Sequence, residues 1–175
     1  TNCLNFGNPE NQEIMGEFAE CLEGIKEACE FLDYPVVSGN VSFYNGTNKK
    51  NIYPTPVIGG VGLIKKLSRP LNHNFKKNNS NLILIGKTLG HLEQSCFLKE
   101  NYSINDGLPP DVNLQNEKNN GESLLKLIEE NLILSSHDVS NGGLITALAE
   151  MTITSDFGAK IQKPKKLTNL YKYFF

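Results

Sequence analysis

The feature that most constrains the fold of this chain is a long amphipathic stretch near its N-terminus. Between about Gln12 and Leu32, apolar side chains recur at steps of three and four residues, which predicts one wide apolar stripe on a helix. The opposite face is rich in glutamate, so we expect this helix to lie on a sheet with its acidic face in solvent. The stripe consists of Ile14, Phe18, Cys21, Leu22, Ile25, Ala28, Cys29 and Leu32.

Strand-like segments stand on both sides of this predicted helix. Residues 1–9 indicate the end of a strand that runs into a loop, and Val36-Val37 indicates the start of a short buried strand. An Asn45-Gly46 turn is expected next. Residues 56–64 form an apolar run long enough for a central strand, in which the glycines indicate close backbone approach. Strands that alternate with helices predict an α/β arrangement.

The remainder of the chain is expected to form a second domain. A polar, irregular segment at 67–80 predicts a linker, with one domain over residues 1–66 and another over residues 81–175. The second domain is expected to have an α+β arrangement. Its expected elements are a buried strand at 82–86, a short strand at 133–136, a loop at 101–119, and helices at 121–131 and 144–151.

Composition limits the classes of function. The chain has 17 basic and 19 acidic residues, so no strong field favours nucleic acid or an acidic membrane as a partner. No apolar run approaches the roughly 20 residues that cross a bilayer. The 4 cysteines lack zinc-site spacing and the start lacks the features of a secretory leader, which favours a reducing, cytoplasmic setting. The start also lacks an initiator Met, so we expect a piece of a longer protein.

The first segment that could carry chemistry is Ser38-Gly39-Asn40-Val41-Ser42, after the expected buried strand. A glycine at position 39 would let a phosphate approach backbone amides, because no Cβ blocks it. The amide oxygen of Asn40 is a neutral, hard ligand suited to Mg²⁺, and the Ser42 hydroxyl can donate to a phosphate oxygen. On its own, so short a string is more typical of an ordinary strand end.

The second segment surrounds Asp138 at an expected strand-to-helix junction. A carboxylate there, followed by Gly142-Gly143 and a helix N-terminus, is typical of a Mg²⁺-phosphate site. Ser140 or Asn141 could equally cap the helix. Neighbours in a strand point to opposite faces, which argues against a catalytic pair formed by His137 and Asp138.

Together, the order and spacing of the motifs resemble those of phosphoribosylformylglycinamidine synthase, in the second of its two homologous halves. The matching strings are TNCLNFGNPE (1–10), PVVSGNVSFYN (35–45), PTPVIGGVGLI (54–64), GLPP (107–110) and SHDVSNGGL (136–144). The resemblance implies a half similar to aminoimidazole ribonucleotide synthetase, with an N-terminal α/β and a C-terminal α+β domain, truncated at both ends. It also implies ATP-dependent conversion of formylglycinamide ribonucleotide and ammonia to formylglycinamidine ribonucleotide in purine biosynthesis.

The resemblance assigns roles to particular residues. It implies ATP contacts for Asn2 and Gly39, a Mg²⁺ ligand at Asn40, a substrate contact at Ser42, and an auxiliary nucleotide or metal site at Asp138. No catalytic residue is assigned within this chain, and we expect the piece alone to be inactive. The chain departs from the pattern at Ser38, where a glycine is usual, and at Glu93-Gln94-Ser95, where Gly-Gly-Ser is common.

The implied partners are a glutaminase subunit with a small accessory subunit, or a fused glutaminase domain that releases ammonia from glutamine. Two alternatives stay open. One is another ATP-dependent synthetase or kinase of the same superfamily, and the other is a non-catalytic structural half.

Overall fold

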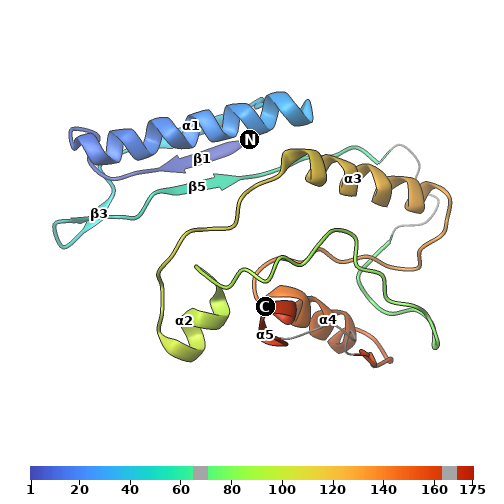
Figure 1. Ribbon diagram of the computed structural model, residues 1–175. Coiled ribbons are helices and arrows are strands. Elements are labelled where there is room, and N and C mark those ends of the chain that lie inside the picture. The colour runs from blue at the N-terminus through green and yellow to red at the C-terminus, as the bar shows by residue number, and fades with distance from the viewer. Residues whose placement is uncertain (65–70, 163–168) are drawn as a thin grey trace. The chain divides into compact units, whose positions relative to one another are not determined.

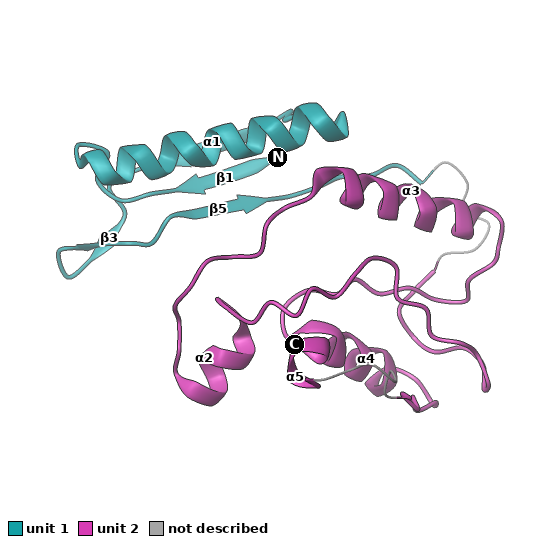
Figure 2. Ribbon diagram, viewed as in Figure 1, with its two compact units in different colours: residues 1–66 teal, residues 67–175 magenta. Residues whose placement is uncertain are grey.

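The computed structural model describes residues 1–64, 71–162 and 169–175 (Figure 1). The chain divides into two compact units, Thr1–Lys66 and Leu67–Phe175 (Figure 2), and each is considered by itself. Residues 67–70 of the expected linker lie outside the described residues, and residues 71–80 contain turns and bends without helix or strand.

Unit 1 is a three-stranded sheet with one long helix along one face (Figure 1). Strand β1 (Asn2–Asn5) is central, with β2 (Gly39–Ser42) parallel to it on one side and β5 (Thr55–Ile58) antiparallel on the other. Parallel neighbours need a crossover connection, and helix α1 (Gln12–Leu32) lies within it. Strands β3 (Gly46–Thr47) and β4 (Lys50–Asn51) form a separate hairpin between β2 and β5.

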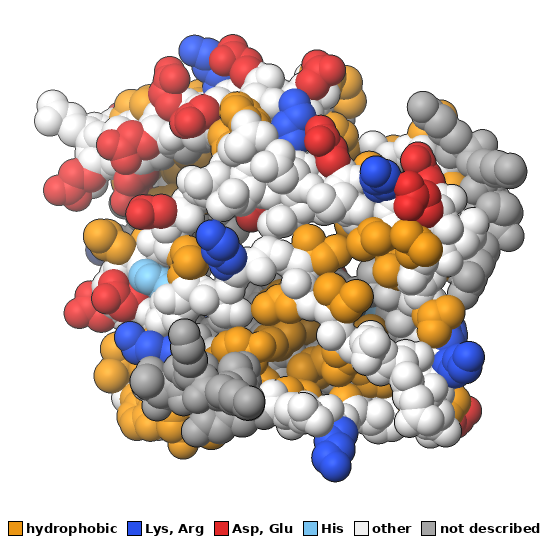
Figure 3. Space-filling view, turned by 45° about the vertical axis from the view of Figure 1, so that its right-hand side comes forward, with side chains coloured by type: hydrophobic (Ala, Val, Ile, Leu, Met, Phe, Trp, Pro, Cys, Tyr) orange, Lys and Arg blue, Asp and Glu red, His pale blue; other side chains and the backbone are white. Residues whose placement is uncertain are grey.

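Helix α1 has the bounds that its periodicity predicts. It begins because the Asn11 side chain accepts a hydrogen bond of 2.9 Å from the Glu13 amide. It ends at Asp33, whose left-handed backbone lets its amide donate to the Cys29 carbonyl. The polar face carries exposed glutamates, and acidic side chains gather over this helix in Figure 3, as expected for a solvated face.

The core of unit 1 lies between α1 and the sheet. Leu4 and Phe6 are 1% and 0% exposed, and Ile14 of α1 packs on them. The Phe18 ring makes edge contacts with the rings of Phe6 and Phe43, at centroid distances of 5.1 and 5.0 Å. The buried stripe is narrower than predicted, since two of its expected members, Leu22 and Leu32, are exposed.

Several strand predictions for unit 1 are wrong. Val36 and Val37 are exposed and precede the strand, which begins at Gly39. The hairpin turn lies at Asn48-Lys49, where both residues have positive φ, and not at Asn45-Gly46. The run at 56–64 forms an edge strand that ends at Ile58 instead of a central strand. Pro56 fits an edge because it has no N–H to donate to a further strand.

Unit 2 is helical in its described residues. Its helices are α2 (Cys96–Tyr102), α3 (Leu114–Glu129), α4 (Gly143–Ile153) and α5 (Tyr171–Phe174). The prediction of a helix at 144–151 is confirmed by α4, which buries Ala147, Leu148 and Met151. Helix α3 begins earlier than predicted because the Asn113 side chain accepts from the Asn116 amide at 2.9 Å and caps it. Helix α2 and the start of α3 also replace parts of the loop expected at 101–119.

The strands expected at 82–86 and 133–136 of unit 2 are not formed. Within 71–162 and 169–175 no strand is present, and Leu82, Ile83 and Leu84 are exposed. Ile133–Ser136 is also irregular. A strand is stable only where a neighbour takes up its backbone groups, and the described part of unit 2 offers none. None of the described helices is long and apolar enough to cross a membrane.

The core of unit 1 gives a first prediction. Phe6→Ala should lower the free energy of opening of β1 and α1 by about 3–5 kcal/mol, because it removes a fully buried ring from a packed aromatic cluster. Hydrogen exchange of the β1 and α1 amides would measure the loss. Tyr53→Ala is the control, since this ring is 88% exposed and its removal should leave exchange nearly unchanged. Equal protection in both variants would contradict the proposed core.

Candidate functional site

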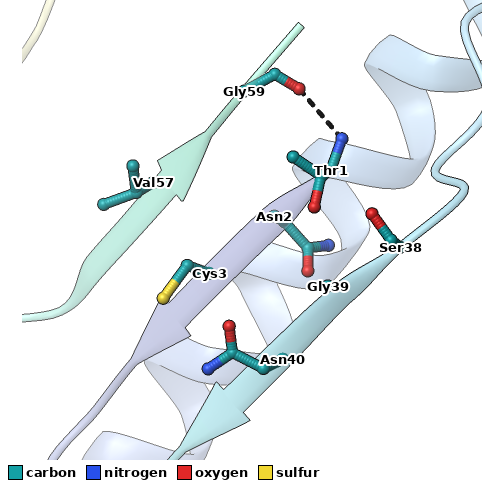
Figure 4. Close-up of a pocket in the computed structure, with 8 residues that line it drawn as sticks. All are labelled: Thr1, Asn2, Cys3, Ser38, Gly39, Asn40, Val57 and Gly59. Carbon is teal, nitrogen blue, oxygen red and sulfur yellow. Dashed lines mark hydrogen bonds between the residues drawn. The ribbon is translucent and has the colours of Figure 1, made fainter.

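A hollow of about 460 Å³ opens on the sheet of unit 1 (Figure 4). It lies where β1 and β2 begin and where β5 ends. Asn2, Gly39 and Asn40 line it, so residues predicted separately from two distant strings are brought together by the parallel pairing of β1 with β2. The remaining lining residues are Thr1, Cys3, Ser38, Val57 and Gly59.

The sheet register decides which side chains share a face. Cys3 lies opposite Asn40 of β2 and Val57 of β5, and successive residues of a strand point to alternate faces. Because Leu4 and Phe6 are buried towards α1, Cys3, Asn40 and Val57 belong to the face that α1 leaves open. In Figure 4 these three side chains point to one side of the sheet, whereas Asn2 points away from them.

Gly39 and Asn2 form a close pair across the two strands. A Cβ on Gly39 would lie 2.8 Å from the Asn2 carbonyl oxygen and would overlap the Asn2 side-chain oxygen. The glycine is therefore required by its neighbour in the sheet. The expectation that it makes room for a phosphate stays a prediction, and the packing against Asn2 supplies a second reason for the same residue.

Ser42 lies further along β2, outside this hollow as the described residues define it. Two steps along a strand return to the same face, so Ser42 shares the open face with Asn40. Ser42 is half-buried, and its hydroxyl oxygen lies 3.1 Å from the side-chain nitrogen of Asn45. Asn40 and Ser42 thus lie two residues apart along β2, on the open face of the sheet.

The residues present fit a weakly held Mg²⁺ ion better than a caged metal. Among the described residues, no group of three or more His, Cys, Asp or Glu side chains could hold a metal. The exposed Asn40 amide oxygen is a single neutral ligand. Mg²⁺ typically keeps several waters and takes its other ligands from substrate phosphates, so one protein oxygen at this position is compatible with it.

Asp138 lies in unit 2, beside a hollow of about 350 Å³. Its carboxylate oxygen is 3.2 Å from His137 Nδ1, and the other ring nitrogen of His137 is 3.1 Å from a Glu150 oxygen. The expectation that His137 and Asp138 point to opposite faces is wrong, because residues 133–138 do not form a strand. A neutral imidazole has one N–H, so only the imidazolium can donate to both carboxylates. The lining residues are Asn72, His73, Leu124, Ser136, His137 and Asp138.

The pKa of the Asp138 carboxyl lies below its usual value. The main causes are a hydrogen bond from its own backbone amide and one from the Ser140 side chain, with a smaller contribution from His137. The residue that caps α4 is Gly142, with φ of 84°, so the interpretation of Ser140 or Asn141 as the cap is wrong. Ser140 instead helps to keep Asp138 charged.

Sequence reasoning missed several residues around these sites. His73 and Glu150 approach His137 from a segment predicted to be linker and from α4, at separations that no local motif indicates. The departure at Glu93-Gln94 has a structural role, because Glu93 accepts from the Leu108 amide at 2.9 Å and Gln94 donates to the Gly107 carbonyl at 3.0 Å. The Asn45-Gly46 pattern predicts only a turn, whereas the Asn45 side chain contacts Ser42 in the structure.

Comparison with known proteins matches both parts of the chain. The model of the AIR synthase related protein N-terminal domain matches residues 1–64, and that of the C-terminal domain matches residues 78–170. These matches confirm the predicted pair of synthetase-like domains.

Curated relatives cover the chain from end to end. Phosphoribosylformylglycinamidine synthase subunit PurL of Pelagibacter ubique is 54% identical over 175 residues, which is 100% of this chain and 24% of that protein. The subunit of the same name from Rhodopseudomonas palustris is 45% identical over 175 residues, again 100% of this chain and 24% of the relative. The one from Bradyrhizobium diazoefficiens is 50% identical over 161 residues, or 92% of this chain and 22% of the relative. The chain therefore spans about a quarter of the length of these relatives.

The geometry around Asp138 predicts a shift in its titration. Ser140→Ala should raise the pKa of Asp138 towards its usual value, because the carboxylate loses a donor. A depressed carboxyl pKa stabilises the fold above the unfolded pKa, and this contribution is lost as the pH falls through the folded pKa. In Ser140→Ala this contribution to stability should therefore be lost at a higher pH than in the wild-type protein.

The measurement is a ¹³C titration of the Asp138 carboxyl carbon. Ser136→Ala is the control, since Ser136 lines the same hollow but is not among the groups that lower this pKa. An unchanged midpoint in Ser140→Ala would contradict the assignment.

Proposed function

Because this chain belongs to the AIR synthase related protein family, we propose that it is part of the second half of a phosphoribosylformylglycinamidine synthase. The activity of the whole protein is then ATP-dependent conversion of formylglycinamide ribonucleotide and ammonia, derived from glutamine, to formylglycinamidine ribonucleotide. The observation that carries this proposal is the 54% identity over all 175 residues with a relative of that name.

In this proposal the hollow of unit 1 belongs to the nucleotide and metal site. Asn40 would offer its amide oxygen to Mg²⁺, and Asn2 and Gly39 would contact ATP. When bound, Mg²⁺ neutralises and orients phosphate oxygens. Ser42 would contact the ribonucleotide substrate through its hydroxyl. The support is that Asn2, Gly39 and Asn40 line one hollow and that Asn40 and Ser42 share one open face.

Asp138 would serve an auxiliary nucleotide or metal site in unit 2. Its exposed, charged carboxylate beside the second hollow supports that role. The proposed domains are residues 1–66 and 81–175 with a linker at 67–80, and the ranges of the two family matches support this division.

We assign no catalytic residue to this chain. The described residues around the first hollow include no histidine, lysine or carboxylate that could transfer a proton. We propose that acid–base chemistry comes from other parts of the protein and that the isolated piece is inactive. The same observation favours, as a second candidate, a half that supports the enzyme structurally without contacting its substrates.

The proposed setting is the cytoplasm, with further polypeptides that deliver ammonia. The relatives are each named as a subunit, which supports the existence of partners. We propose that these are a glutaminase subunit and a small accessory subunit, or a fused glutaminase domain. Neither nucleic acid nor a membrane has a role in this proposal.

The proposed activity has a direct test. The intact protein, supplied with formylglycinamide ribonucleotide, ATP and a high concentration of ammonia, should release phosphate and the amidine product. High ammonia removes the need for a glutaminase. Folded protein that fails to turn over under these conditions would refute the assignment.

The role of Asn40 gives a further prediction. Asn40→Ala should lower turnover of the intact protein by at least about tenfold at limiting Mg²⁺, since the loss of about 1.4 kcal/mol of transition-state stabilisation is a factor of ten. Excess Mg²⁺ should partly restore the rate.

If Asn40 had only a structural role in β2, the variant would lose roughly 1 kcal/mol of stability and keep its rate. Steady-state kinetics at varied Mg²⁺, together with thermal melts, separate the two outcomes.

A further inference from the structure

Ser42 is held by the side chain of one nearby residue, Asn45. The side-chain nitrogen of Asn45 lies 3.1 Å from the Ser42 hydroxyl oxygen, 2.9 Å from the Ser42 carbonyl oxygen and 3.1 Å from the Phe6 carbonyl oxygen. Both Ser42 and Asn45 are half-buried. One side chain therefore connects the ends of β1 and β2 and also sets the position of the Ser42 hydroxyl.

The orientation of the Asn45 amide is fixed by these contacts. Its nitrogen faces two carbonyl oxygens, which can only accept hydrogen bonds. A flipped amide would place its own oxygen against both carbonyls, with no hydrogen between them. The nitrogen must therefore stay on the side of Ser42. Its two hydrogens face three oxygen atoms, so any hydrogen bond to the Ser42 hydroxyl is shared with one of the two carbonyl oxygens.

This orientation places both polar atoms of the Asn45 side chain beside the Ser42 hydroxyl. A hydroxyl has one hydrogen to donate and lone pairs that accept. The side-chain nitrogen of Asn45 lies 3.1 Å from the hydroxyl oxygen, and the side-chain oxygen of Asn45, which accepts the hydroxyl hydrogen, lies 3.4 Å from it. The position of the hydroxyl is therefore set by one neighbouring side chain.

We propose that Asn45 is a positioning residue, which holds the Ser42 hydroxyl where it contacts the ribonucleotide substrate. This inference rests on the proposed substrate contact of Ser42.

The backbone around Asn45 is fixed independently of its side chain. Tyr44 has a positive φ of 59°, and its amide donates to the Gly7 carbonyl at 2.8 Å. The backbone amide of Asn45 donates to the Phe6 carbonyl oxygen at 3.1 Å, and the backbone amide of Phe6 donates to the Ser42 carbonyl oxygen at 2.9 Å. Both carbonyls that face the Asn45 side chain thus keep a backbone donor in Asn45→Ala, so we expect this variant to fold.

The test uses the intact protein with Asn45→Ala, Asn45→Asp, Ser42→Ala and the double variant Asn45→Ala/Ser42→Ala. Asn45→Ala should raise KM for formylglycinamide ribonucleotide about tenfold, with little change in KM for ATP. Asn45→Asp should raise it further, because a carboxylate has no N–H to donate and its negative charge repels the two carbonyl oxygens that the Asn45 nitrogen faces. The double variant should be no worse than Ser42→Ala, because both changes remove one contact.

Asn51 provides the matched control. Its side-chain oxygen accepts from the Asn8 amide at 3.0 Å in the same unit, and no described contact joins it to Ser42. Asn51→Ala should lower the melting temperature without a selective rise in KM for the ribonucleotide. If the Asn45 variants behave like Asn51→Ala, the positioning role is wrong.

The remaining outcomes are also decisive. If Ser42→Ala raises KM and the Asn45 variants do not, the inference fails while the proposed function stands. If the two changes add in full in the double variant, Asn45 does not act through Ser42, and the inference fails. If Ser42→Ala has no effect in an active enzyme, both the inference and the proposed substrate contact of Ser42 are wrong. An inactive wild-type protein refutes the proposed function itself. Should Asn45→Asp not fold, Asn45→Ala and the double variant still decide the question.

Discussion

The alternation of side chains along β1 is the constraint on which unit 1 depends. Leu4 and Phe6 are buried against α1, and this burial fixes which face of the strand is inside. A shift by one residue would expose both, so the register is strongly specified. The pairing of β1 with β2 then fixes which face each residue of β2 occupies, because Cys3 lies opposite Asn40 and Asn5 lies opposite Ser42. The hydrophobic core therefore determines that the two candidate ligand-binding side chains stand on the open face.

Local patterns could be predicted well from the sequence, and pairings between distant segments could not. Helix α1 follows from its periodicity and its end residues, all within one stretch of chain. A strand needs a neighbouring strand to pair with. The apolar runs at 36–37, 82–86 and 133–136 do not indicate which segment, if any, would pair with each of them. Where no described neighbour exists, as at Leu82 to Leu84, the chain remains irregular and exposed. The error at His137 has the same origin, because the rule of alternate faces applies only within a strand.

The candidate site was predictable in its location but not in its internal contacts. The strings that contain Asn2 and Gly39-Asn40 indicate chemistry, and the structure brings them into one hollow. The sequence does not indicate which side chains contact one another within the site. The contact of Asn45 with Ser42 depends on the left-handed backbone of Tyr44, a conformation that a tyrosine rarely adopts and that no turn motif indicated.

The close approach of Asn2 and Gly39 makes these two positions a single steric unit. The volume that a side chain would need at position 39 is already occupied by the asparagine of the neighbouring strand. A Cβ at position 39 would also lie 2.8 Å from the backbone carbonyl oxygen of Asn2, which any residue at position 2 would carry. A smaller side chain at 2 would therefore not make room by itself, and a larger residue at 39 would have to move the two strands apart and open the sheet beneath the hollow. The pairing of β1 with β2 thus restricts position 39 to glycine, whichever side chain stands 37 places earlier in the chain (39 − 2).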